Sequence, residues 1–455
     1  MNLFLKNVSF FWEGGSEPLR ENVSILIEGT KIKEVGPEAE VSKKAAGARN
    51  IYCDGLVIIP GLVNTHHHFY QTLTRNLPKV QNAELFEWLI NLYPIWANFT
   101  PEDFKLSTTI ASLELLESGC TTAVDHSYLV PQGQAIIYQR QIEAAKQTGL
   151  RFHLCRGSMS RSKKDGGLPP DSVVQTEDTI MQETKELVSH YHQFQSGGMI
   201  RIIVAPCSPF SVTPELMIEA KKYANSKGLK AHTHLAETKD EENYCIREYG
   251  CRPFELMEKY NWMDKNSFFA HSIHFSQEEI TRMGEAKGGV AHCPTSNMRL
   301  GSGIAPIVEM HKAGVPIGLA VDGSASNDCS NMMQEVRQCL LLQRVLKGAK
   351  CISALDALNY ATSGGARILG RDDIGYIKAG YEADLVGFPL GRLRHAGGSS
   401  DPLASLVFCS ADKVDLSIVN GELLIHKGKF TRFSDEEINE LQQKQNERAL
   451  QLGKL

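Results

Sequence analysis

The chain has 455 residues, of which 42% are hydrophobic and 22% charged, and this composition excludes collagen-like, coiled-coil and largely disordered folds. With 48 Lys and Arg against 53 Asp and Glu, the formal net charge of −5 argues against nucleic acid as a partner, since a phosphate backbone needs a basic surface. The N-terminus lacks the features of a signal peptide, and the longest apolar runs are too short to span a bilayer. Eleven cysteines without a CxxC pair suit a reducing compartment. The sequence therefore predicts a cytoplasmic protein with no membrane partner.

Short β-rich segments separated by turns occupy residues 1–60, and the same pattern of segments and turns occurs again within residues 370–433. There, Asn420-Gly421 is a strong signal for a two-residue hairpin. Because these segments flank a long middle region, we expect one small β-sandwich domain assembled from both termini. Residues 434–455 begin with a capping box, SDEE, and predict a C-terminal surface helix.

The middle region, residues 61–369, alternates short apolar runs with longer amphipathic stretches. This alternation is typical of βα units around a parallel sheet. Eight candidate strands can be counted, at 57–66, 121–126, 151–155, 200–206, 229–234, 267–271, 288–293 and 316–322. The sequence therefore predicts an α/β protein with a (β/α)8 TIM barrel as its catalytic domain.

Reactive side chains fall at the C-terminal ends of these predicted strands. They are His66, Asp125, His126, His234, His271 and Asp322. Active sites of (β/α)8 barrels are built at this end of the barrel. The coincidence of six such residues predicts one site there.

The motif NTHHH at 64–68 places His66 and His68 on the same side of an extended strand end, with His67 pointing away as a non-ligand. Imidazole is a common metal ligand, and zinc is the usual ion at His-rich sites. For this motif alone, a structural pair of histidines is the commoner interpretation.

The motif AHTHLAE at 231–237 places His234 three residues before Glu237. A carboxylate close to a metal-activated water can take and return protons, although a solvated loop residue is an equal alternative for Glu237. By strand alternation His232 lies on the side of His234, where it either supports the ligands or contacts substrate.

Two more motifs complete the set. His271 ends the sixth predicted strand, where a packed core histidine is the alternative, and Asp322 ends the eighth, where an ordinary turn is the alternative. Taken together, three histidines and one aspartate from strands one, five and eight predict a site for one divalent ion with an open water position. The chain contains no HExxH, PCxxC, GxSxG, Walker A or GxGxxG motif.

The segments PGLVNTHHH, HTHLAE, AHSIH and AVDGSASND resemble the amidohydrolase superfamily in its mononuclear deaminase branch. The resemblance covers essentially the whole chain. It implies one divalent metal per chain, commonly Zn²⁺, held by four residues: His66, His68, His234 and Asp322. Binuclear members carry a carbamylated Lys at the end of strand four, but this strand ends IVAPCSP, which disfavours a second metal.

The resemblance also implies catalytic roles for three residues. Asp322 would accept the proton of the attacking water, Glu237 would protonate the ring nitrogen, and His271 would orient the attacking oxygen. The expected reaction is hydrolytic deamination of an aminated aromatic heterocycle.

The segments at 64–78, 81–96 and 156–174 are similar to those of 8-oxoguanine deaminases, which predicts conversion of 8-oxoguanine to urate and ammonia. Hydroxyatrazine aminohydrolases and pterin deaminases are also similar, so isoxanthopterin, guanine and hydroxy-s-triazines stay open as substrates. A catalytically inactive scaffold is the alternative of a different class. We expect Gln71, Arg156 and His232 to contact the substrate. The sequence leaves the oligomeric state open, with a homo-oligomer among the options.

Overall fold

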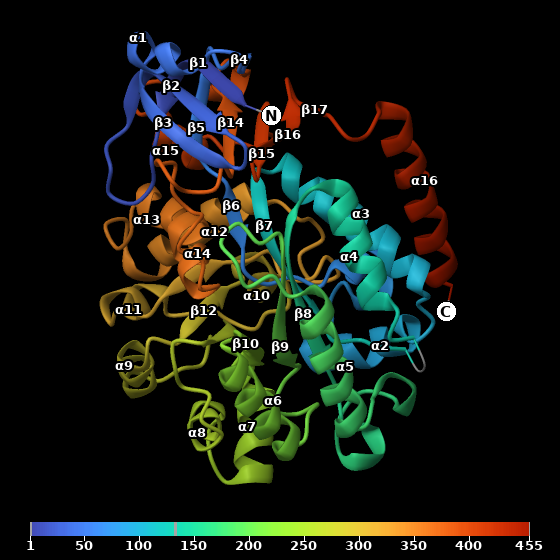
Figure 1. The fold of residues 1–455 in the computed structure, drawn as a ribbon. Helices are drawn as coiled ribbons and strands as arrows, with labels where there is room; N and C mark the ends of the chain where they lie inside the picture. Colours follow the sequence, from blue (N-terminus) through green and yellow to red (C-terminus); the bar gives the residue numbers. More distant parts are fainter. Residues whose placement is uncertain (1, 132–133, 455) are drawn as a thin grey trace.

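A barrel of eight parallel strands forms the centre of the protein in the computed structural model, which describes residues 2–131 and 134–454 (Figure 1). The strands neighbour one another in chain order, and Thr65 N donates to Leu319 O (3.0 Å) between the first and last of them. They are β6 (Leu62–Asn64), β7 (Cys120–Ser127), β8 (Arg151–Ser158), β9 (Ile200–Pro206), β10 (Ala231–Leu235), β11 (Ser267–His271), β12 (Gly289–His292) and β13 (Ile317–Leu319). The predicted (β/α)8 barrel is therefore confirmed.

Helices surround this barrel and connect its strands. Thr100 caps α3 reciprocally with Asp103, and Pro101 occupies its first turn, so the sequence itself fixes where this helix begins. The surrounding helices are α2 (Leu85–Trp96), α3 (Pro101–Glu117), α4 (Ile137–Thr148), α5 (Glu177–Tyr191), α6 (Pro214–Lys227), α7 (Lys239–Tyr249), α8 (Pro253–Lys259), α9 (Gln277–Ala286), α10 (Pro294–Arg299), α11 (Ile307–Lys312), α12 (Met332–Lys347), α13 (Ala354–Asn359) and α14 (Gly365–Ile368). A 3₁₀ helix, η2 (Phe69–Thr74), follows β6 directly.

Both termini contribute to a second, mixed sheet, as predicted. Figure 1 shows its blue N-terminal and red C-terminal strands side by side at one end of the molecule. Its nine strands are continuous, and one buried cluster joins residues from both termini, including Ile25, Ile58, Leu385 and Ile418. They are β1 (Leu3–Phe11), β2 (Arg20–Glu28), β3 (Lys31–Pro37), β4 (Arg49–Tyr52), β5 (Leu56–Pro60), β14 (Leu385–Pro389), β15 (Leu416–Val419), β16 (Glu422–His426) and β17 (Lys429–Phe430), with α1 (Glu38–Val41) and α15 (Pro402–Phe408) beside them.

The single strand expected over 57–66 is two strands in the structure. β5 belongs to the terminal sheet and β6 to the barrel, and Gly61 lies between them. A Cβ at Gly61 would lie 2.1 Å from Thr121 Oγ1, so the chain can pass between the two sheets here only with glycine.

The predicted C-terminal helix is α16 (Asp435–Leu452), which begins with the expected capping box at Ser434. It runs along the outside of the barrel domain beside α3 (Figure 1). Arg448 pairs with Asp103 (2.8 Å), and Gln445 Nε2 donates to Thr72 Oγ1 (3.0 Å). The helix therefore fixes the segment that follows β6.

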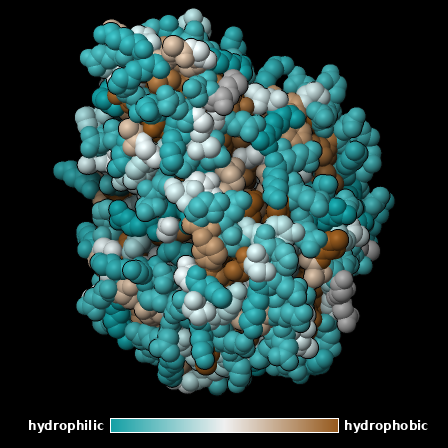
Figure 2. Space-filling model, viewed as in Figure 1, coloured by the Kyte–Doolittle hydropathy of each residue, from teal (hydrophilic) through white to brown (hydrophobic). Residues whose placement is uncertain are grey.

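The face of the molecule in Figure 2 is mostly hydrophilic, with hydrophobic residues in small recesses. Among the described residues, no helix combines the length and apolarity that crossing a membrane requires. All eleven cysteines are free thiols.

Candidate active site and metal centre

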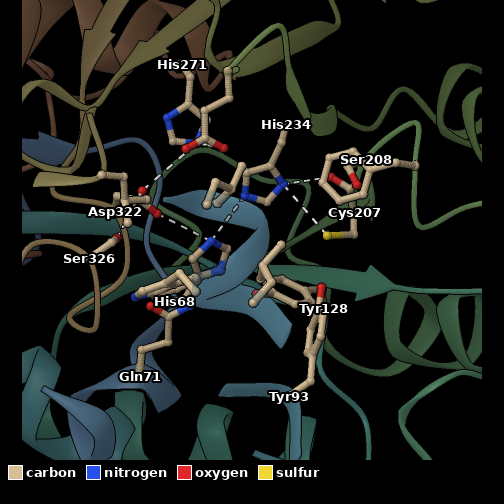
Figure 3. Close-up of a pocket in the computed structure, with 16 residues that line it drawn as sticks. His68, Gln71, Tyr93, Tyr128, Cys207, Ser208, His234, His271, Asp322 and Ser326 are labelled. Atoms are coloured by element: carbon tan, nitrogen blue, oxygen red, sulfur yellow. Dashed lines mark hydrogen bonds and ion pairs between the residues drawn. The ribbon is translucent and has the colours of Figure 1, made fainter. Parts of the chain in front are cut away.

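Four predicted ligand side chains converge at the C-terminal end of the barrel. Asp322 Oδ1 lies 3.3 Å from His66 Nε2 and 3.4 Å from His68 Nε2. His68 Nε2 in turn lies 3.2 Å from His234 Nε2. Figure 3 shows His68, His234 and Asp322 directed toward one another. The structure thus brings together residues that are up to 256 positions apart in the chain.

Hydrogen bonds to the opposite ring nitrogens fix the tautomers of two of these imidazoles. His68 Nδ1 donates to the backbone oxygen of His126, and His234 Nδ1 donates to that of Cys207, both at 2.7 Å. A carbonyl oxygen only accepts, so the proton of each neutral ring is on Nδ1. The Nε2 atoms of both rings therefore carry free lone pairs, and these two atoms lie 3.2 Å apart.

The third imidazole is fixed through a relay of two hydrogen bonds. His232 Nδ1 donates to Phe268 O (2.8 Å), which leaves His232 Nε2 as an acceptor. His66 Nδ1 donates to that nitrogen at 2.7 Å, so His66 Nε2 also presents a lone pair. That Nε2 is buried and has no hydrogen-bond partner among the residues that the structure describes.

Electrostatics keep these groups in the form that binds a cation. Burial is the main cause that lowers the pKa of His66, His68 and His234, so the three rings are neutral. Burial opposes ionisation of Asp322, but its close contact with His66 (3.3 Å) and the charge of His271 hold the pKa of Asp322 well below its usual range. The three facing ring nitrogens and the carboxylate are all unprotonated, which suits binding of a divalent ion such as zinc.

Glu237 and His271 lie beside this donor set. His271 Nε2 is 3.4 Å from Glu237 Oε2 and 4.0 Å from Asp322 Oδ2, and its Nδ1 donates to Asn297 Oδ1 (2.8 Å). Burial raises the pKa of Glu237 to about 7, although His271 opposes the shift. Burial lowers the pKa of His271, but Glu237 and Asp322 outweigh it and the net shift is upward. A carboxyl group with a pKa near neutrality can act as both acid and base.

Strained backbone accompanies the site. His271 (φ 72°), Asp322 (φ 63°) and Ala236 (φ 53°) adopt left-handed conformations, which non-glycine residues seldom occupy. Glu241 supports one of these turns, since its carboxylate accepts hydrogen bonds from Ala236 N (2.8 Å) and Glu237 N (2.9 Å).

A cavity opens onto these side chains. Gln71 Oε1 faces Ala325 N at 3.4 Å, while its buried Nε2 has no partner among the described residues. Trp88 also lines the cavity and donates from its indole nitrogen to Ala325 O (3.2 Å), whereas Trp96 packs in the core. The lining comprises His68, Gln71, Leu85, Trp88, Leu89, Tyr93, Tyr128, Cys207, Ser208, Phe210, His234, Glu237, His271, Leu300, Asp322 and Ser326.

The structure places Arg156, expected to contact substrate, outside the cavity lining. β8 continues to Ser158, three residues beyond the predicted strand end, so Arg156 lies inside the strand. Its guanidinium pairs with Glu183 (2.5 Å) and lies 5.3 Å from the Tyr138 ring centroid, away from the cavity lining.

His232 does not line the cavity either. Its ring is held between His66 Nδ1 and Phe268 O, and it stacks on the Phe268 ring with centroids 4.0 Å apart. Of the two roles considered for His232, these contacts favour support of His66 over contact with substrate.

Asp125 and His126, predicted to be reactive from their positions at a strand end, do not line the cavity. Asp125 accepts from Phe69 N (2.9 Å) and Gln141 Nε2 (2.5 Å), and His126 provides its carbonyl to His68. His67, expected to point away, contacts Ser330 Oγ at 3.0 Å.

Sequence reasoning missed three polar residues that support the site. Ser296 donates to Asp322 Oδ2 (2.6 Å), Asn297 holds His271, and Glu241 holds the turn before Glu237. Ser296 and Asn297 follow β12 within a few residues, and that position at the C-terminal end of a strand was the available signal.

A TIM barrel with a His₃Asp cluster and an acid–base pair at the C-terminal ends of its strands defines a hydrolase of the metal-dependent class. The chain belongs to the Amidohydrolase family, which it matches over residues 57–424.

Individual relatives agree with this assignment. An 8-oxoguanine deaminase from Pseudomonas aeruginosa is 52% identical over 365 residues, covering 80% of this chain and 81% of the relative. A hydroxydechloroatrazine ethylaminohydrolase from Pseudomonas sp. (strain ADP) is 34% identical over 431 residues, covering 91% and 89%. Among solved structures, atrazine chlorohydrolase from Arthrobacter aurescens TC1 complexed with zinc has a TM-score of 0.93 at 29% identity, covering 98% of this chain and 100% of that one.

Proposed function

We propose that this protein is a cytoplasmic metal-dependent aminohydrolase that converts 8-oxoguanine to urate and ammonia. The observation that carries the substrate is the 52% identity with the P. aeruginosa 8-oxoguanine deaminase, against 34% for the triazine and pterin relatives. In the reaction, water adds its oxygen to C2 of the purine, the C2–N bond to the exocyclic amine breaks, and ammonia leaves.

His66, His68, His234 and Asp322 would hold one divalent ion, with Zn²⁺ the first candidate. The convergence of their proton-free ligand atoms supports this set. When bound, such an ion supplies Lewis acidity that makes water easier to deprotonate near neutral pH.

Three residues would move the protons and guide the attack. Asp322, ionised in the site, accepts the proton of the attacking water. Glu237, with its pKa of about 7, protonates the ring nitrogen next to C2 as the amine carbon becomes tetrahedral. His271, within 4.0 Å of both carboxylates, orients the attacking oxygen and stabilises its charge.

The remaining cavity suits a flat heterocycle. Its walls include the apolar side chains of Leu85, Trp88, Phe210 and Leu300. Gln71 presents an unpaired amide nitrogen toward the cavity and would donate to an oxygen or ring nitrogen of the purine.

The direct test is release of ammonia from purified, zinc-loaded protein with 8-oxoguanine, guanine, isoxanthopterin and hydroxyatrazine. We expect the highest kcat/KM for 8-oxoguanine, with urate as the product by absorbance and chromatography. A higher kcat/KM for one of the other three compounds would overturn the substrate. Absence of ammonia from all four, with the metal present, would favour the inactive scaffold.

A further inference from the structure

A second hollow opens at the opposite, N-terminal end of the barrel strands. It has a volume of about 630 Å³, and positively charged residues from successive strand starts line it. Arg201 is the second residue of β9, Lys230 directly precedes β10, Lys265 lies two residues before β11, and Lys287 two residues before β12. Arg367 of α14 adds a fifth cation.

These cations lack acidic partners, although the chain as a whole is acidic. No Asp or Glu lines the hollow, and none of the five cations forms an ion pair within residues 2–131 and 134–454. Three carboxylates act on Arg201 or Lys230: Asp264 pairs with Lys221 (2.8 Å) and Asp373 with Arg371 (2.7 Å), while Asp372 is exposed and forms no ion pair among the described residues. Arg201 Nε is buried and has no hydrogen-bond partner among the described residues.

Burial, together with neighbouring positive charge, disfavours the charged forms of two of these cations. Burial and the neighbouring Arg371 lower the pKa of Arg201 to about 10, and burial with Lys221 and Lys265 nearby lowers that of Lys230 to about 8. Partly buried cations without acidic partners cost folding free energy, and an anion bound among them would offset that cost.

An exposed aromatic side chain, Phe194, also lines this hollow and could contact an aromatic part of the ligand. Phe194 lines the hollow and is 60% exposed, with its ring centroid 4.1 Å from that of His192. An exposed ring next to a cationic cavity can stack on a nucleobase while the cations bind phosphates.

We propose that this hollow binds a nucleoside polyphosphate, at a site separate from the metal centre. Arg201, Lys230, Lys265, Lys287 and Arg367 contact the phosphate groups, and Phe194 contacts the base. The site adds a ligand to the protein and is independent of which heterocycle the metal centre hydrolyses.

Isothermal titration calorimetry of the full-length protein with ATP tests the proposal, with tripolyphosphate and adenosine as separate arms. We expect ATP to bind with micromolar affinity that weakens as salt is raised, tripolyphosphate to bind more weakly and adenosine not to bind. No heat with millimolar ATP would overturn the proposal. Tripolyphosphate binding as tightly as ATP would overturn the nucleotide assignment, and adenosine binding as tightly would overturn the role of the cations.

Variants locate the site. Lys230→Gln combined with Arg201→Gln should weaken ATP binding at least tenfold, and so should Lys287→Glu, which changes an exposed residue. The matched control combines Lys185→Gln and Lys222→Gln, two exposed lysines outside the hollow, and should leave the affinity unchanged. Chelation of the active-site metal by ATP would be the same in all variants, so equal affinity in Lys287→Glu and the control would overturn the proposal.

Discussion

His232 Nε2 lies 2.7 Å from His66 Nδ1, and neither ring can reverse the direction of this hydrogen bond. The carbonyl of Phe268 fixes the proton of His232 on Nδ1, so His66 must donate and its Nε2 must present a lone pair. A residue expected to contact substrate therefore determines the tautomer of a metal ligand.

Replacing His232 with Phe should reduce zinc affinity, because His66 then loses the acceptor that fixes its tautomer. Loss of such a supporting hydrogen bond costs roughly 10- to 100-fold in metal affinity or activity. Competition with a chromophoric chelator gives the affinity, and excess zinc should restore much of the activity. His67→Phe is the matched control, since His67 contacts Ser330 Oγ and the backbone nitrogen of His68 but none of the proposed ligand atoms. Equal zinc affinity in the His232 and His67 variants would contradict the relay.

Glu237→Gln should keep zinc and lose turnover. The amide keeps the shape of the side chain but cannot transfer a proton, and loss of general acid–base catalysis costs about 10²- to 10⁴-fold. Elemental analysis and kcat check the two halves of the prediction.

The control for this variant is Glu219→Gln, on the exposed side of α6, and it should leave kcat unchanged. Glu241 is unsuitable as a control because its carboxylate holds the backbone of Ala236 and Glu237. Near-normal turnover in Glu237→Gln would show that this carboxylate takes no part in proton transfer.

Arg156→Met should destabilise the fold and leave the choice of substrate unchanged. The guanidinium is buried against Glu183 and Tyr138, and its loss leaves Glu183 with only the neutral amide of Gln175 as a partner, where breaking a buried ion pair costs about 3–5 kcal/mol. We expect a thermal midpoint several degrees lower, with the ratio of kcat/KM for 8-oxoguanine and guanine within twofold of the original. A changed kcat/KM ratio at unchanged thermal stability would show instead that Arg156 contacts the substrate.

The sequence was sufficient to predict that the proposed ligand residues meet at one end of the barrel, because their positions at strand ends carry a clear signal. His66, His234 and Asp322 each follow an apolar run, and the parallel order of the strands brings those ends together. The position of a residue at the C-terminal end of a strand can thus be predicted from a single sequence.

The partners that orient those ligands could not be predicted in the same way. His68 and His234 are fixed by the backbone oxygens of His126 and Cys207, and a carbonyl is present at every residue whatever its type. Arg156 lies outside the cavity lining because β8 extends beyond the expected strand end, and its side chain pairs with Glu183 of α5. Strand length and register depend on neighbouring strands, so a single sequence constrains them weakly.

Acid should weaken the fold through Asp373. This carboxylate accepts two hydrogen bonds from Arg371 (2.7 and 2.8 Å) and one from Gly197 N (2.7 Å). Burial opposes its ionisation, but the contacts with Arg371 outweigh burial and hold the pKa of Asp373 well below its usual range. The unfolded chain, with an Asp pKa of about 3.9, then binds a proton more readily than the folded protein. The stabilisation by Asp373 is therefore complete above about pH 4 and is lost as the pH falls toward the lower, folded-state pKa.

Thermal midpoints of the wild type and of Asp373→Asn between pH 3 and pH 7 measure this contribution. Asn cannot ionise, so the variant should be less stable by a constant amount at neutral pH, and the gap should narrow as the pH falls below about 4. Asp372→Asn, at the exposed neighbouring position, is the matched control and should follow the wild type throughout. A gap for Asp373→Asn that stays constant down to pH 3 would show that the stabilising contacts do not depend on the charge of this carboxylate.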